Sequence, residues 1–150
     1  MNTATAEANE EPRIRELIDD WANALRGKDA AGVLSCHAAG LVQFSLAPPL
    51  QYAGANALGK KGLDEWFSSF QGAIGYEIRD LSITVDNNIA YCHSLNRITG
   101  TRKDGEKTDL WIRETMCFRK INGDWKISHE HESVPFYMDG SARAAIDLKP

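Results

Sequence analysis

The sequence contains few cysteines and no long apolar run, and neither sign of charge dominates it. Cys36, Cys92 and Cys117 are odd in number and lack metal-ligand spacing, so we expect reduced, buried thiols rather than disulfides or a zinc site. No apolar run approaches the roughly 20 residues of a membrane-spanning helix. Residues 1–11 lack the basic start and apolar core of a signal peptide. These absences predict a cytoplasmic protein without a membrane partner.

Several catalytic and binding motifs are also missing. The sequence holds no Ser-His-Asp order, phosphate-binding loop, dinucleotide fingerprint or nucleophile elbow. Its 17 basic and 21 acidic residues are interspersed, with a net charge of -4, and offer no basic surface to nucleic acid. We expect no nucleic-acid partner and no cofactor. The 150 residues, 43% hydrophobic, fit one domain.

Helical spacing dominates the first half of the chain. Pro12 begins a run of apolar residues at helical spacing that stops at Arg26-Gly27, and Asp29 is placed to cap a short second helix. A third helix is predicted after Gly54, with an apolar stripe that ends before Gly72. The stripe consists of Leu63, Trp66, Phe67 and Phe70. Strand patterns over 41–46 and 50–52 lie between the last two helices.

Alternating apolar and polar residues dominate the second half. They predict four antiparallel strands, over 76–85, 89–101, 106–120 and 125–134. Three helices followed by this meander predict an α+β fold, in which the helices cover one face of an antiparallel sheet. We expect this domain over 12–136, a disordered N-terminal tail over 1–11 and a C-terminal tail over 137–150.

Two dipeptides suggest how the strands pair. Asp104-Gly105 and Asn122-Gly123 are typical of two-residue type I′ hairpin turns. With such turns, Glu114 lies opposite His131, and Met116 lies opposite His93 and His129. A bulge or a three-residue loop would change this register.

The predicted register sorts the side chains into two faces. The face expected to lie under the helices carries Tyr91, His93, Leu95, Arg97, Leu110, Ile112, Glu114, Met116, Phe118, Ile127, His129 and His131. The other face, expected at solvent or at a subunit interface, carries Asp109, Trp111, Arg113, Lys126, Ser128, Glu130 and Glu132. Trp111, Arg113, Glu130 and Glu132 are the predicted interface residues.

The predicted catalytic residues are His131, His129 and Glu114. Either histidine is a candidate general acid or base, with Glu114 orienting the imidazole and raising its pKa. Both histidines are equally consistent with hydrogen-bonded core residues. A two-histidine, one-carboxylate metal site is a further alternative, but a lone His-x-His pair is weak evidence, so we predict no metal.

The predicted ligand-binding residues are His93, Arg97, Tyr91, Met116, Trp66 and Phe70. Arg97 either pairs with Glu114 or anchors a carboxylate or enolate oxygen of a ligand. Trp66 and Phe70 fit the core or the wall of a pocket.

The C-terminal half resembles a known family. The stretches 109–120 and 122–136 resemble the SnoaL-like ketosteroid isomerase homologues of the nuclear transport factor two-like superfamily. Glu114-Thr115, Trp125 and His129-Glu130-His131 are also similar to the association domain of calcium/calmodulin-dependent protein kinase II. The resemblance, over 12–136, implies a cone-shaped barrel of strongly bent antiparallel sheet packed against three N-terminal helices, with one helix-lined pocket, and commonly a homodimer.

The sequence departs from the functional residues of these relatives. Ketosteroid isomerases use an aspartate base and a helix tyrosine, where this chain has Phe44 and Trp21. The pocket arginines of the kinase association domains correspond to His93, Met116 and Glu132. We therefore expect a homodimer that binds a small, partly apolar molecule. It either acts as a cofactor-independent isomerase, dehydratase or cyclase, or serves as a non-catalytic binding or self-association module.

Overall fold

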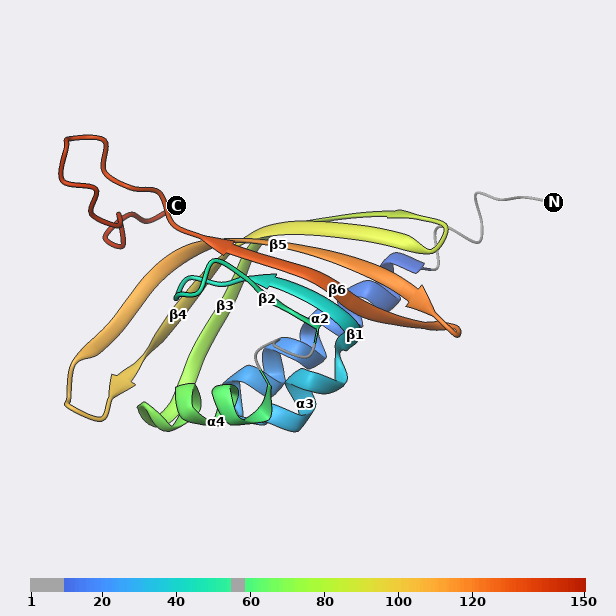
Figure 1. Cartoon of the computed structure of the whole chain (residues 1–150), viewed down its shortest axis with the longest axis horizontal. Coiled ribbons are helices and arrows are strands. Elements are labelled where there is room, and N and C mark those ends of the chain that lie inside the picture. Colours follow the sequence, from blue (N-terminus) through green and yellow to red (C-terminus); the bar gives the residue numbers. More distant parts are fainter. Residues whose placement is uncertain (1–9, 55–58) are drawn as a thin grey trace.

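The computed structural model describes residues 10–54 and 59–150, which form helices packed against one side of a curved sheet (Figure 1). The helices are α2 (Glu10–Arg26), α3 (Ala30–Ser35) and α4 (Lys60–Ser68). The strands are β1 (His37–Phe44), β2 (Tyr52–Ala53), β3 (Phe70–Asp86), β4 (Ile89–Arg102), β5 (Lys107–Ile121) and β6 (Asp124–Ser133).

The three helices form where the spacing of apolar residues predicts them. α2 buries Ile14, Ile18, Trp21 and Leu25 against the sheet, and the Asp29 carboxylate caps α3 by accepting the Gly32 amide at 2.9 Å. α4 ends at Ser68, so Phe70 begins β3 instead of closing the helix. Residues 55 and 56, expected to open this helix, lie outside the described residues.

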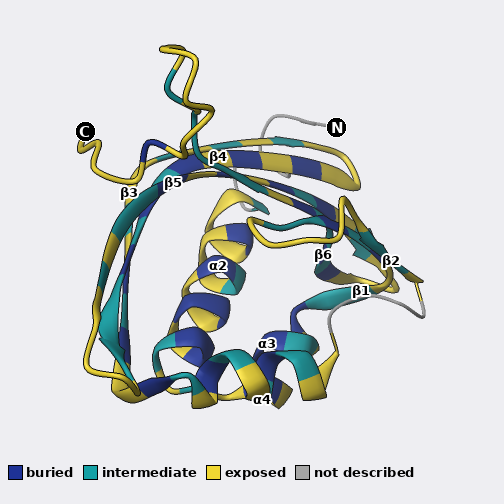
Figure 2. Cartoon of the chain, turned by 60° about the vertical axis from the view of Figure 1, so that its left-hand side comes forward, coloured by how far each residue is buried: buried dark blue, intermediate teal, exposed yellow. Residues whose placement is uncertain are grey.

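The strands form a six-stranded sheet in the order β2-β1-β6-β5-β4-β3. β3 to β6 form the predicted antiparallel meander, whereas β1 runs parallel to β6 and carries β2 at the edge. The sheet curves around α2, which lies across its concave side (Figure 2). The predicted α+β fold, with three N-terminal helices against a bent sheet, is confirmed.

Secondary structure extends into both segments that were predicted to be tails, 1–11 and 137–150. α2 begins at Glu10, two residues inside the predicted N-terminal tail, and residues 1–9 of that tail lie outside the described residues. The segment after β6 stands away from the sheet and folds back on itself through a bridge between Phe136 and Ala144. Among the described residues, no helix combines the length and the apolar character needed to cross a bilayer.

The predicted register of β4 and β5 is wrong by one residue. The loop has three residues, 103–105: the Gly105 amide bonds to the Arg102 carbonyl at 2.9 Å, and the Arg102 amide bonds to the Glu106 carbonyl at 2.8 Å. Gly105 has φ +90, which fits the glycine that ends a three-residue hairpin loop. Because one residue is added to the loop, every side chain of β4 points to the face opposite the predicted one.

The register of β5 and β6 is correct only near the turn. Asn122 and Gly123 have φ 52 and 86, as a two-residue type I′ turn requires. Phe118 pairs with Ile127 as predicted, but Cys117 pairs with His129, so Ser128 forms a bulge. Beyond this bulge the faces are exchanged, and Glu130 and Glu132 point to the concave side in place of His129 and His131.

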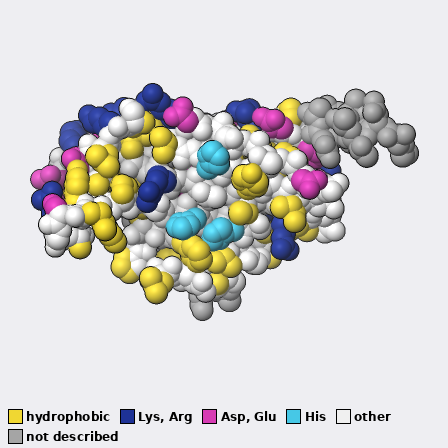
Figure 3. Space-filling view, turned by 90° about the horizontal axis from the view of Figure 1, so that it is seen from above, with side chains coloured by type: hydrophobic (Ala, Val, Ile, Leu, Met, Phe, Trp, Pro, Cys, Tyr) yellow, Lys and Arg dark blue, Asp and Glu magenta, His cyan; other side chains and the backbone are white. Residues whose placement is uncertain are grey.

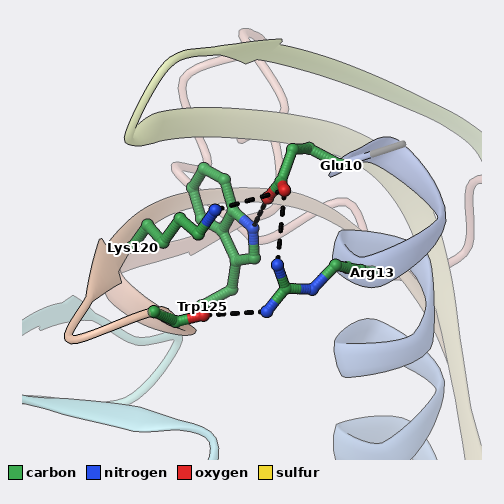
Figure 4. A network of polar contacts seen from close by, with 5 residues as sticks. Glu10, Arg13, Lys120 and Trp125 are labelled. Atoms are coloured by element: carbon green, nitrogen blue, oxygen red, sulfur yellow. Dashed lines mark hydrogen bonds and ion pairs between the residues drawn. The ribbon is translucent and has the colours of Figure 1, made fainter. Parts of the chain in front are cut away.

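A polar network attaches the start of α2 to the β5–β6 hairpin (Figure 4). The Glu10 carboxylate accepts hydrogen bonds from the Trp125 indole, from Lys120 at 3.2 Å and from Arg13 at 3.3 Å. Arg13 also donates to the Gly123 carbonyl at 2.8 Å. The indole hydrogen bond, with Lys120 and Arg13, lowers the pKa of Glu10. The network holds α2 across the concave face.

Candidate active site

A cavity of about 410 Å³ lies between the helices and the concave side of the sheet. Its aromatic lining comes from Trp21, Tyr52, Trp66, Phe70 and Tyr76, and its polar lining includes His37, Gln43, Arg102, Glu130 and Glu132. A cavity of this size, mostly apolar with a few polar groups, is typical of sites that bind small organic molecules.

Three glutamates meet on the concave side of β5 and β6. Glu114 pairs directly with Glu132 across the strands, and one carboxyl oxygen from each of Glu114, Glu130 and Glu132 lies within 4.8 Å of the others. Glu130 and Glu132 line the cavity, and Glu114 is only 2% exposed. Sequence alternation and the Ser128 bulge together produce this cluster.

The pKa values of these carboxyls respond to burial and to one another. Burial, and then the neighbouring Glu130 and Glu132 carboxyls, raise the pKa of Glu114 well above its ordinary value. Burial and the Glu130 carboxyl raise the pKa of Glu132 to about 8. At neutral pH the cluster therefore retains protons, and Glu132, which borders the cavity, is placed to exchange one with a bound molecule.

A hydrogen-bonded chain orients Tyr76 beside the glutamates. The Ser94 hydroxyl donates to the Asn96 amide oxygen at 2.7 Å, and the Asn96 amide nitrogen donates to the Tyr76 hydroxyl at 2.9 Å. Burial, followed by the charges of Glu114 and Glu132, raises the pKa of Tyr76 well above its ordinary value. Since its oxygen accepts from Asn96, the neutral hydroxyl keeps its proton to donate elsewhere.

His37 and Gln43 complete the polar end of the cavity. Gln43 donates to a Glu130 oxygen at 3.2 Å, and His37 Nε2 lies 3.9 Å from the same oxygen. Burial lowers the pKa of His37, which the Glu130 charge only partly opposes, so the imidazole is neutral at pH 7. Among the described residues, His37 Nε2, the Gln43 side-chain oxygen and both Glu114 oxygens are buried without a hydrogen-bond partner.

The predicted catalytic residues do not come together. Glu114 lies on the concave side as predicted, but His129 and His131 project from the convex side, because of the bulge at Ser128. The Phe44 ring contacts both imidazoles there, with ring centroids 4.8 and 5.2 Å apart, and His129 Nδ1 lies 2.8 Å from the Val42 carbonyl oxygen. The register that joined them to Glu114 is wrong.

The predicted ligand-binding residues are divided between the two faces. Trp66 and Phe70 line the cavity, and Met116 is buried on the concave side, 1% exposed. Tyr91, His93 and Arg97 project from the convex face, since all of β4 is inverted relative to the prediction. Arg97 pairs with Asp109 through two hydrogen bonds of 2.9 and 2.8 Å, not with Glu114.

The predicted interface residues are likewise divided. Trp111 and Arg113 lie on the convex face as predicted, whereas Glu130 and Glu132 face the cavity. The convex face gathers histidines among hydrophobic side chains (Figure 3). One row across its strands contains His93, Thr115, His131 and Phe44.

Sequence reasoning missed the polar end of the cavity. His37 begins β1, where its side chain is 8% exposed, and nothing in the local sequence marks it as part of a site. Tyr76, Gln43 and Ser94 carry no local signal of a site. The alternation of glutamates and histidines over 129–132 was visible, but it does not show which set faces inward.

Comparisons with known proteins agree with this fold. A SnoaL-like domain model matches residues 14–137. An NTF2-like protein of unknown function from Pseudomonas putida is 30% identical, with a TM-score of 0.82 over 99% of both chains. A candidate scytalone dehydratase from Novosphingobium aromaticivorans is 17% identical, with a TM-score of 0.79 over 95% of both chains.

More distant similarity extends to a kinase association domain. The association domain of C. elegans calcium/calmodulin-dependent protein kinase II is 14% identical, with a TM-score of 0.65 over 85% of this chain and 98% of that one. A search of the curated proteins found none similar to this chain. The family match over most of the length, and the full-length similarity to the Pseudomonas protein, show that this chain belongs to the SnoaL-like domain family.

Proposed function

We propose that the chain is an acid–base enzyme that isomerises, dehydrates or cyclises a small, partly apolar molecule without a cofactor. One observation carries the proposal: Glu130 and Glu132 border an aromatic-walled cavity, with the carboxyl of Glu114 behind them. In this scheme the Glu132 carboxylate removes a proton from the substrate, and its raised pKa makes it a stronger base than an ordinary glutamate.

Tyr76 supports the same scheme from β3. Its neutral hydroxyl donates a hydrogen bond to the substrate oxygen on which negative charge develops, because Asn96 already occupies one of its acceptor positions. The candidate scytalone dehydratase among the similar structures makes a dehydration one reasonable form of this chemistry.

A probe reaction tests the base without knowledge of the substrate. In the ring opening of 5-nitrobenzisoxazole, a base removes the ring C–H proton, the N–O bond breaks, and a coloured nitrophenolate forms. We expect the full chain to accelerate this reaction and Glu132→Gln to lose roughly 10²- to 10⁴-fold in rate. Glu106→Gln, at an exposed position, is the matched control. Equal rates in the parent and in Glu132→Gln would contradict the proposal.

Self-association is a second proposed function, supported by the convex face and the C-terminal segment. Tyr91 is 48% exposed on this face, and Phe136, Met138 and Ile146 are 65%, 95% and 53% exposed on the segment that stands away from the body. Large apolar side chains that are exposed to solvent to this degree are typical of surfaces that contact another protein chain. We propose that a second copy covers them in a homodimer, which light scattering at micromolar concentration tests.

A further inference from the structure

The glutamate cluster has no cationic partner within the described part of the chain. Among the described residues, the basic side chain nearest to the three carboxylates is His37, whose neutral imidazole places Nε2 3.9 Å from a Glu130 oxygen. Both oxygens of Glu114 are buried without a hydrogen-bond partner. Structural carboxylates that are buried to this degree normally pair with lysine or arginine, so any negative charge that the cluster carries when it loses protons is left for something else to balance.

The groups that face the cluster from neighbouring elements are neutral. They are Tyr76 on β3, Cys92 on β4, and His37 and Gln43 on β1. Burial raises the pKa of Cys92 to about 12, so this thiol is also uncharged. None of these groups supplies a positive charge.

Arg102 is the cationic residue that lines the described cavity, and its guanidinium contacts residues other than the glutamates. Its guanidinium donates to the Ser69 hydroxyl at 2.5 Å and stacks 4.6 Å from the centre of the Phe70 ring. Arg102 lies eight residues further along β4 than Ser94, which pairs with Glu114. It therefore does not neutralise the cluster.

The polar end of the cavity offers hydrogen-bond acceptors in excess. Glu130 and Glu132 present carboxyl oxygens, and the side-chain oxygen of Gln43, a residue only 8% exposed, has no partner among the described residues. A primary ammonium brings three N–H donors and a guanidinium five, with no acceptor of their own. An ammonium or a guanidinium therefore donates hydrogen bonds to these oxygens and neutralises the negative charge of the glutamates.

The remaining walls suit an organic body attached to that charge. Trp21, Trp66, Phe70 and Tyr76 surround the rest of the cavity. Aromatic rings bind apolar groups and attract cations through their faces. A bare metal ion needs neither the aromatic walls nor a cavity of about 410 Å³.

We propose that the cavity binds an organic cation, an ammonium or guanidinium group on an apolar or aromatic body, with its charge against Glu130 and Glu132. The proposal rests on the proposed function, because it names the class of molecule on which the same site acts. The cation stays bound at the glutamates, while the rest of the molecule lies along the aromatic wall.

Calorimetry with matched probes tests this ligand class. We would titrate the full chain with primary amines from n-butylamine to phenethylamine, and with the alcohol and the carboxylic acid of the same skeleton. At least one amine should bind about tenfold or more tightly than its alcohol, and the acids should bind most weakly. Affinity for the amine should fall about tenfold in Glu132→Gln and in Glu130→Gln, but not in Glu106→Gln. It should also increase from about pH 6 to about pH 8.5, as the cluster loses protons.

Two results would overturn the proposal. One is that no amine in the series binds more tightly than its alcohol. The other is binding of Mn²⁺ or Ca²⁺ that displaces the amines and is lost in Glu132→Gln, which would assign the cluster to a metal ion. If the benzisoxazole reaction still depends on Glu132, the first result rejects the cationic ligand and leaves the acid–base function standing.

Discussion

Glu114 and Glu132 lie directly opposite each other on β5 and β6, and both side chains face the helices. Like charges at directly opposed positions of an antiparallel pair destabilise the sheet, and burial makes the repulsion stronger. The fold therefore keeps this pair at least partly protonated at neutral pH. This relationship makes both stability and activity depend on pH.

Stability should fall as the pH rises through the neutral range. The folded-state pKa of Glu114 lies above its unfolded value of about 4.5, so the folded chain binds more protons and loses stability with increasing pH. Urea unfolding at about pH 6 and about pH 8 should show that Glu114→Gln loses less stability than the parent, by on the order of 1–3 kcal/mol. Glu106→Gln should follow the parent. The same loss in all three proteins would show that Glu114 does not hold an extra proton.

The rate of the benzisoxazole reaction should rise with pH and level off above about pH 8. A general base acts in its deprotonated form, and burial with the Glu130 carboxyl raises the pKa of Glu132 to about 8. His129→Ala and His131→Ala should retain the parent rate, because both side chains project from the opposite face. A rate that depends on either histidine would contradict this prediction and would place the catalytic base on the convex face.

The Glu10 network should stabilise the fold in a pH-dependent way. Its folded-state pKa is lowered by the Trp125 indole and by Lys120, so its contribution is present above the ordinary pKa and lost as the pH falls through the lowered one. Glu10→Gln should cost about 1 kcal/mol at neutral pH, and less in acid. Glu11→Gln, at an exposed position one residue along, is the control. Urea unfolding measures both, and equal costs at the two pH values would contradict the role of the charge.

A charge on the convex face should separate the proposed homodimer. Tyr91 projects from β4 on that face, so Tyr91→Lys should shift sedimentation toward the mass of one chain. Ser68→Lys, at an exposed position of α4 on the opposite side of the sheet, should leave the mass unchanged. A parent protein that sediments as a monomer would remove the basis for this prediction.

The fold could be predicted because its signals are local. Helical spacing from Ile14 to Leu25, the cap at Asp29 and the turn at Asn122-Gly123 each follow from nearby residues. The orientation of the strands could not be predicted in the same way. Asp104-Gly105 suits both a two-residue turn and the three-residue loop that the chain adopts, and this choice inverts all of β4.

The prediction of the candidate site was wrong for a related reason. Glu114 was correctly placed on the concave side because β5 keeps regular alternation, whereas Glu130 and Glu132 follow the bulge at Ser128. Serine is not a residue type that indicates a bulge in a sequence. In the structure, the Ser128 hydroxyl donates a hydrogen bond to the Cys117 carbonyl at 3.2 Å. Long-range pairing in the curved sheet places that irregularity, so a count from the nearest turn does not reveal it.

The bulge at Ser128 also affects how function is transferred between homologues. Histidine and glutamate alternate over residues 129–132, so the two residue types point to opposite faces of β6. Strand pairing alone selects which of them reaches the cavity. A relative with an identical tetrapeptide but a regular last strand would enclose histidines instead of glutamates. Aligned letters at these positions therefore indicate common ancestry without indicating common chemistry, and site residues can be assigned across the family only where the bulge is shared.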